Sequence, residues 1–137
     1  MHPTVVEREL EMRLILAPGR TAAVAALLSY RTDDPYAVHV TFHIDTDWPV
    51  HWTFARELLV EGVFRPSGDG DVRVWPSRSD GRAVVLMALS SPDGEALLEA
   101  STPPVSAWLE RTLRACPPGS EGGRLGLDDA LADLLAR

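Results

Sequence analysis

The stretch that decides the fold is residues 36–54, YAVHVTFHIDTDWPVHWTF, in which apolar and polar side chains alternate on both sides of an acidic turn. Its apolar residues stand at even positions, namely Val38, Val40, Phe42, Ile44, Val50, Trp52 and Phe54. Residues two apart in a strand lie on the same face. We therefore expect an antiparallel hairpin in which Ile44 lies opposite Val50, since this pairing keeps every even residue on one side of the sheet.

Similar alternation surrounds this hairpin. Residues 9–16 place apolar side chains at every even position, and Pro18-Gly19 indicates a turn before a second strand over 21–31. A short helix is expected over 55–61, with Gly62 ending it in a left-handed conformation. Three more strands are expected over 72–75, 83–90 and 95–99, with Pro76 at a sheet edge or a strand end.

Two further helices complete the predicted chain. Residues 103–115 place Val105, Trp108, Leu109, Thr112 and Leu113 on one stripe, and Ser101 or Thr102 could cap the helix. Residues 118–126 are expected to be a flexible polar segment before a last helix over 128–136. The predicted fold class is α+β, with antiparallel β-sheets, about three helices packed on them and one domain over 1–137.

Composition restricts the possible functions. The net charge is −7, and all 13 basic residues are arginine, so no reaction that needs a lysine is open to this chain. Cys116 is the single cysteine, and no apolar run reaches the ~20 residues of a membrane helix. The first residues also lack the pattern of a secretory signal. We expect a cytoplasmic protein that neither inserts into a membrane nor binds nucleic acid, because its negative charge repels phosphate.

Residues with catalytic or metal-binding chemistry are few. The expected hairpin register places His43 opposite His51, near Asp45, which would allow a weak metal site or two solvated imidazoles. The loop of residues 67–71, SGDGD, lacks the ligand pattern of a calcium site and is better interpreted as a turn. No serine or cysteine has the surroundings of a nucleophile. We therefore predict no enzyme activity, no catalytic residue, no cofactor and no metal.

Exposed aromatic and arginine residues are the better candidates for a site. Trp48 lies in the hairpin turn beside Pro49, and Phe64 follows the short helix just before Pro66. Together with nearby arginines they would form an anchor for a protein partner. The candidate partner-binding residues are Trp48, Phe64, Arg65, Arg78 and Arg82. Burial against the sheet, or in an interface between subunits, is the alternative for the two aromatic residues.

Several motifs in combination resemble the SsgA-like sporulation and cell division proteins of actinobacteria. They are DPYAVHVTFH (34–43), WTFARELLVEG (52–62), RPSGDGDVRVWPSR (65–78), SSPDGEALLEA (90–100), LERT (109–112) and PPGSE (117–121). The resemblance covers about residues 9–121. It leaves the subfamily open, an SsgB-type protein included.

The resemblance implies a fold similar to that of the whirly single-strand-binding proteins and a homo-oligomer, with a trimer as the expected state. It also implies an adaptor, located at division septa, that recruits or supports the division GTPase FtsZ or acts on another division protein. It supplies no catalytic residues. The whirly-like fold suggests single-stranded nucleic-acid binding as the alternative function, although a fold does not by itself transfer a function. A small-ligand carrier is a third possibility.

Overall fold

The computed structural model describes residues 2–124, which contain seven strands and three helices. The strands are β1 (Val5–Ala17), β2 (Arg20–Arg31), β3 (Ala37–Phe42), β4 (Val50–Ala55), β5 (Val72–Ser79), β6 (Arg82–Ser91) and β7 (Gly94–Ser101). The helices are α1 (Arg56–Gly62), α2 (Thr102–Ala115) and α3 (Glu121–Arg124). These elements confirm the predicted α+β class.

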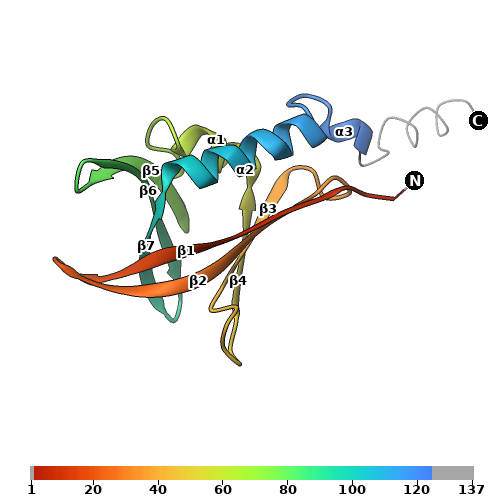
Figure 1. Ribbon diagram of the computed structural model, residues 1–137. Coiled ribbons are helices and arrows are strands. Elements are labelled where there is room, and N and C mark those ends of the chain that lie inside the picture. Colours follow the sequence, from red (N-terminus) through yellow and green to blue (C-terminus); the bar gives the residue numbers. More distant parts are fainter. Residues whose placement is uncertain (1, 125–137) are drawn as a thin grey trace, which may run out of the picture.

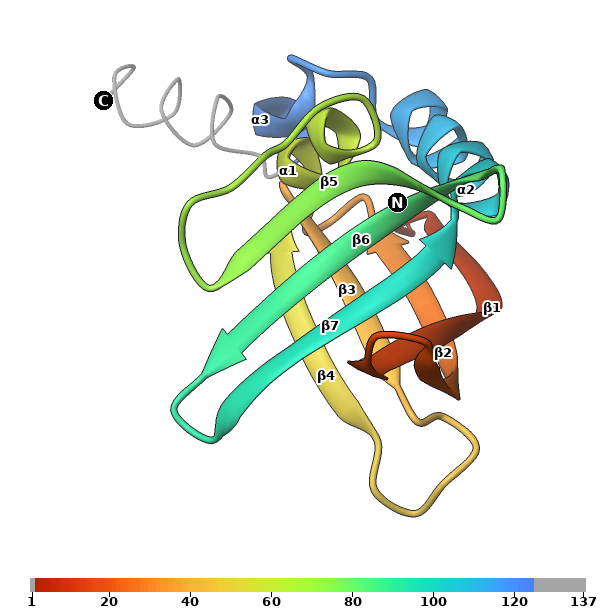
Figure 2. The same ribbon diagram turned by 90° about the vertical axis from the view of Figure 1, so that its left-hand side faces the viewer.

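All seven strands belong to one antiparallel sheet in the order β4-β3-β2-β1-β7-β6-β5. β1 and β7 pair through only two residue pairs, Arg13 with Glu99 and Leu14 with Leu98. The sheet bends strongly there, so that β5–β7 pass in front of β2–β4, and the helices lie across one end (Figures 1 and 2). The short β1–β7 pairing is what allows one sheet to fold over its own core.

The hydrophobic core lies between the two parts of the sheet and beneath α2. Even-numbered side chains of β2 and β3 supply one wall, and β6 and β7 supply the other; examples are Val24, Leu28, Val38, Val40, Val85, Met87 and Leu98. Trp108 of α2 is fully buried, and its indole Nε1 donates a hydrogen bond to the Val6 carbonyl oxygen at 3.0 Å. This bond fixes α2 to β1 while satisfying the one polar atom of the indole.

The predicted β3–β4 hairpin is confirmed, but its register is shifted by two residues. β3 ends at Phe42, which pairs with Val50, so Ile44 lies in the loop instead of opposite Val50. The strand ends there because His43 has a φ of 59°, outside the extended region. A shift of two preserves the face of every side chain, which explains why the predicted apolar face is correct although the register is wrong.

The other strands occur where they were expected but are longer. β1 begins at Val5 rather than at Glu9, and β5 continues to Ser79 rather than ending at Trp75. Pro76 lies inside β5, which is an edge strand. The prediction that Pro76 lies at a sheet edge is therefore confirmed, whereas the prediction that it ends a strand is wrong. An edge strand has a neighbour on only one side, so it can continue through a proline.

The role predicted for Gly62 is wrong. The glycine is the last residue of α1, it does not have a positive φ, and the capping residue Val63 is right-handed at φ −69°. Space is the physical reason for the glycine. A Cβ atom at this position would lie 2.4 Å from Cγ1 of Val74, so the missing side chain lets α1 pack closely on β5.

Helix α2 agrees with the prediction except at its start. Val105, Trp108, Leu109 and Thr112 are buried as the predicted stripe requires. Ser101 occupies the N-cap position, but its side chain makes no capping hydrogen bond.

Part of the segment expected to be flexible, residues 118–126, is ordered as α3 instead. Glu121 of α3 forms an ion pair with the buried Arg56, which supplies the physical reason. The helix predicted over 128–136 lies outside the described residues. Within residues 2–124, no helix is both long enough and apolar enough to cross a membrane.

Candidate functional site

An apolar groove between α1 and α2, hereafter the helix groove, is the first candidate surface. It encloses about 80 Å³, and its apolar lining consists of Val60, Val63, Phe64, Leu109 and Leu113. Phe64 is 73% exposed even though it lines the groove. The backbone N–H of Phe64 donates to the Glu61 carbonyl at 2.9 Å, so the end of α1 holds this residue in place. The groove therefore presents an aromatic side chain to solvent from a fixed backbone.

Arg56 links the two helices that form the helix groove. Its side chain is almost completely buried, and Nη1 donates to the Thr112 carbonyl oxygen at 3.0 Å. Its Nη2 lies 3.5 Å from a Glu121 carboxylate oxygen, and its guanidinium lies 4.9 Å from the centre of the Tyr30 ring. One side chain thus joins α1, α2, α3 and the sheet. The sequence analysis did not single out this residue.

Trp48 forms the second candidate surface. It lies in the loop between β3 and β4, at the end of the molecule opposite the helices (Figures 1 and 2), and is 84% exposed. Thr46 orders this loop, because its Oγ1 donates to the His43 carbonyl at 2.8 Å and accepts from the Trp48 backbone N–H at 3.2 Å. The loop therefore holds a large apolar side chain in solvent.

The three candidate arginines lie in two places. Arg65 follows Phe64 and pairs with Glu61 at 3.6 Å. Arg78 and Arg82 flank the β5–β6 turn, where Arg78 donates to the Gly81 carbonyl at 3.2 Å. The structure therefore brings Phe64 together with Arg65, and Arg78 together with Arg82. Trp48 is remote from both groups, and the five candidate residues do not form one patch.

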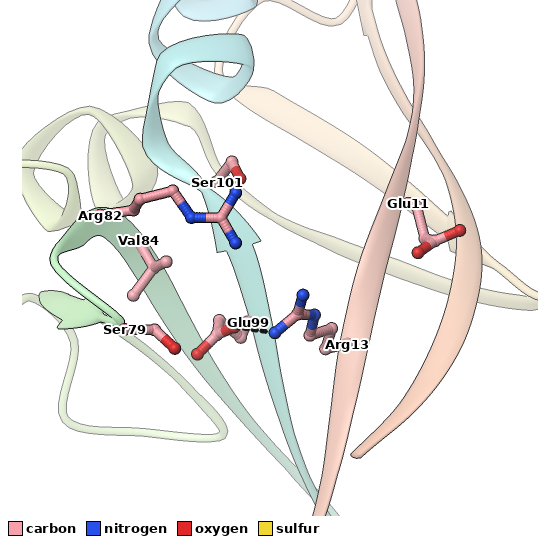
Figure 3. A pocket seen from close by; sticks show the side chains of 7 residues that line it. All are labelled: Glu11, Arg13, Ser79, Arg82, Val84, Glu99 and Ser101. Atoms are coloured by element: carbon pink, nitrogen blue, oxygen red, sulfur yellow. Dashed lines mark ion pairs between the residues drawn. The ribbon is translucent and has the colours of Figure 1, made fainter.

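Arg82 contributes to a polar hollow on the outer face of the sheet, hereafter the arginine hollow. It encloses about 150 Å³ and is lined by Glu11, Arg13, Ser79, Arg82, Val84, Glu99 and Ser101. Arg13 of β1 and Arg82 of β6 lie on either side of β7, and Arg13 pairs with Glu99 at 3.8 Å (Figure 3). Arg13 and Glu99 were not among the predicted site residues.

A third hollow, of about 170 Å³, opens between the two parts of the sheet at the end opposite the helices. Its lining is apolar apart from His43, and includes Phe42, Trp52, Leu89 and Leu98. Small-molecule sites usually enclose ~300 Å³ or more and carry several polar anchors. This hollow is smaller and more uniformly apolar than such sites, so it does not favour the small-ligand carrier; a larger hollow, of about 300 Å³, lies on the outer face of β5–β7.

The histidines of β3 and β4 have other partners than the sequence predicted. The observed register places Thr41, not His43, opposite His51, and Thr41 Oγ1 lies 2.9 Å from His51 Nδ1. His39 lies between Asp34 and Thr53, with Nε2 2.9 Å from the Asp34 carboxylate and Nδ1 3.0 Å from Thr53 Oγ1. The suggested grouping of His43, His51 and Asp45 is therefore wrong. Residues 2–124 contain no group of three or more His, Cys, Asp or Glu arranged to hold a metal ion.

Tyr30 and Asp33 have clearly shifted pKa values. Burial raises the pKa of the Tyr30 phenol well above that of a free tyrosine, and a contact with Cys116 adds to the effect. The phenol donates a hydrogen bond to the Pro35 carbonyl at 3.0 Å. At the surface, two hydrogen bonds of 2.9 Å from Arg31 lower the pKa of Asp33. Both shifts belong to packing and turn structure, and neither group lies in a hollow.

Comparison with known proteins agrees with this architecture. Residues 24–121 match the family described as Streptomyces sporulation and cell division protein, SsgA. The chain is 53% identical over 133 residues to the sporulation-specific cell division protein SsgB of Streptomyces coelicolor, covering 97% of both chains. It is 41% identical over 133 residues to SsgB of Thermobifida fusca, covering 97% of this chain and 96% of that protein.

Two solved structures have the same fold. One comes from work on SsgB mutations that correlate with longitudinal cell division during sporulation of Streptomyces coelicolor. It superposes with a TM-score of 0.87 at 52% identity, covering 90% of this chain and 98% of that one. The other, an SsgA-like sporulation-specific cell division protein from Thermobifida fusca, gives a TM-score of 0.86 at 40% identity over 97% of both chains. The chain belongs to the SsgA family of sporulation and cell division proteins, and its relatives from Streptomyces coelicolor and Thermobifida fusca are named SsgB.

Proposed function

We propose that this chain is a non-enzymatic adaptor in sporulation-linked cell division, and that it recruits or supports FtsZ at septum sites. Its membership of a sporulation and cell division family supports the process. The exposure of Phe64 over the helix groove supports the adaptor role, because a large apolar side chain held in solvent beside an apolar groove is typical of a protein-binding anchor. The FtsZ partner is the expectation that follows from the family resemblance.

The link that Arg56 makes between α1 and α2 also favours partner binding. Arg56 holds α1 to α2 through Thr112, so little ordering of the groove is needed when a partner binds. Preorganisation of this kind raises affinity because less conformational entropy is lost. We expect the protein to act as a homo-oligomer, with a trimer as the first state to test, in the cytoplasm and concentrated at septa.

Charge pairing supports the adaptor over the nucleic-acid alternative. Binding of single strands uses a continuous basic groove with aromatic stacking platforms. Four arginines of the described chain instead pair with carboxylates at 2.9–3.8 Å: Arg13, Arg31, Arg56 and Arg65. The exposed aromatic side chains of Trp48 and Phe64 also lie apart from one another. A net charge of −7 adds general repulsion of phosphate.

Co-sedimentation with FtsZ polymers tests the proposal. Purified chain is mixed with FtsZ from the same organism, with or without GTP, and its amount in the pellet is measured. We expect saturable pelleting that requires GTP and weakens about tenfold or more for Phe64→Ala, the loss typical of an aromatic anchor. Leu16→Ala is the matched control, because Leu16 is also an exposed apolar residue but lies at the end of β1.

Two outcomes would contradict the proposal. Absence of pelleting at about 50 μM chain would exclude useful direct recruitment of FtsZ at cellular concentrations. Unchanged pelleting after simultaneous replacement of Trp48, Phe64, Arg65, Arg78 and Arg82 would show that the contact surface lies elsewhere. Unchanged secondary structure in each variant, measured by circular dichroism, is the control for folding.

A further inference from the structure

The outer face of the bent sheet carries two neighbouring hollows, which are separate from the helix groove and from the Trp48 loop. The arginine hollow lies over β1, β7 and β6 (Figure 3). A second hollow, of about 300 Å³, lies on the same face of β5–β7. This recess is hereafter the tryptophan hollow; its apolar lining consists of Ile15, Trp75, Ala88, Leu89, Ala96 and Leu97, and Arg73, Ser90 and Glu95 line the rest. One face of the sheet thus offers a polar recess beside one that has apolar side chains for a partner to contact.

The arginine hollow has unused donors for an anion. The side chain of Arg82 has no hydrogen-bond or ion-pair partner within residues 2–124. Arg13 contacts Glu99 at 3.8 Å, which is longer than a hydrogen bond, so its N–H groups also remain available. In Figure 3 both guanidinium groups point into the hollow, whereas Glu11 points away. Planar guanidinium groups with free donors match a carboxylate in shape and charge.

The charges of the arginine hollow favour a ligand group with a single negative charge. Arg13 and Arg82 contribute two positive charges, and Glu99, whose side chain is only 14% exposed, removes one of them. Among the charged groups that point into the hollow the sum is therefore about +1, which suits one carboxylate better than a doubly charged phosphate; Glu11 also lines the hollow, but its side chain is turned away (Figure 3). Glu99 and Glu11 would also repel a phosphate backbone that ran along this face, so a protein segment is favoured over a nucleic acid.

The spacing of the two hollows fits an extended peptide. Val84 lines the arginine hollow, and Ala88 lines the tryptophan hollow four residues further along β6. Four strand residues span about 13 Å, so a partner segment in extended conformation would reach both hollows with side chains four positions apart. We propose that this face binds an extended segment of a protein partner, with an Asp or Glu in the arginine hollow and an apolar side chain in the tryptophan hollow.

The biological meaning of this site depends on the adaptor role proposed above, whereas its chemistry can be tested without FtsZ. The full chain is immobilised and used to select from a phage-displayed library of random twelve-residue peptides. We expect the selected peptides to share an acidic residue and an apolar residue four positions apart. A selected peptide should then bind Arg82→Gln about tenfold more weakly, the loss expected for a hydrogen bond to a charged group. Arg78→Gln is the matched control, because Arg78 flanks the same turn but does not line the hollow.

The outcomes separate the alternatives. Selection of basic or purely apolar peptides, or an equal loss for Arg78→Gln and Arg82→Gln, would overturn the proposal. Displacement of the peptide by an oligothymidylate or by inorganic phosphate at equal concentration would show a general anion site and would overturn it as well. Failure of FtsZ co-sedimentation alongside a positive peptide selection would refute the FtsZ partner while leaving the docking site intact.

Discussion

Replacing Gly62 with alanine adds one methyl group where α1 packs on β5. The new Cβ would lie 2.4 Å from Cγ1 and 2.5 Å from Cβ of Val74, whereas carbon atoms in contact are normally ~3.5–4 Å apart. Val74 is fully buried and β-branched, so it cannot swing aside. Overpacking of this kind costs up to ~3 kcal/mol, and alanine recovers ~1 kcal/mol through its helix propensity. We expect a net loss of about 2 kcal/mol in the free energy of unfolding.

Urea unfolding followed by tryptophan fluorescence measures this change, and a loss of about 2 kcal/mol should also lower the Tm by about 8 °C. Gly70→Ala is the control, since no atom lies within 4 Å of its added Cβ and the change should stay within about 0.5 kcal/mol. Val74→Ala should not rescue Gly62→Ala, because the Cβ of residue 74 remains in place. A Gly62→Ala chain at least as stable as the parent would refute the packing role of this glycine.

Three further predictions concern buried polar groups. Trp108→Phe leaves the Val6 carbonyl without its 3.0 Å donor and creates a small void. We expect the free energy of unfolding, measured in urea, to fall by about 2–3 kcal/mol. A fall of less than about 0.5 kcal/mol would contradict this. Arg56→Met keeps the apolar stem of the side chain but removes the donor to the Thr112 carbonyl, so the free energy of unfolding should fall by about 3 kcal/mol. Backbone amides of α3 should also exchange with solvent faster. Unchanged amide exchange in α3 would show that Arg56 does not anchor this helix. Burial raises the pKa of Tyr30, so the unfolded chain ionises first above pH ~10, and the free energy of unfolding should fall with rising pH by up to about 1.4 kcal/mol per unit. Tyr30→Phe should flatten that slope, and an equal slope in both proteins would assign it to another group.

Strand positions could be predicted because alternation of apolar residues is a local signal, whereas strand ends and register could not. The shift in the β3–β4 hairpin follows from the positive φ of His43, a conformation that histidine does not indicate in the sequence. The start of β1 was missed because Arg8 interrupts the even-numbered apolar series. The role of Gly62 could not be predicted for a different reason. The residue has to be glycine because of its close approach to Val74, which lies on another element.

Some residues of the candidate surfaces could be identified from the sequence, and others could not. The prolines and turns beside Trp48 and Phe64 made these residues candidates for exposure, but the sequence left burial open, and the structure shows both to be exposed. Arg56 could not be identified, because its carbonyl partner Thr112 lies 56 residues further along the chain and only the fold brings the two together. Arg13 and Glu99 meet through the two-pair junction of β1 and β7, for which the sequence carries no local signal.

The two proposed binding surfaces depend on different parts of the fold. A variant that has lost one partner contact can therefore be told apart from a variant that has lost its structure. The helix groove depends on Arg56, which holds α1 to α2. The arginine hollow depends on the β1–β7 junction, where Arg13 pairs with Glu99. Phe64 is exposed and lines the helix groove but neither hollow of the outer face, so Phe64→Ala should weaken FtsZ pelleting and leave peptide binding to the outer face unchanged. A single exposed substitution that abolished both would indicate that the sheet and helices had separated, since the helix groove and the arginine hollow share no lining residue.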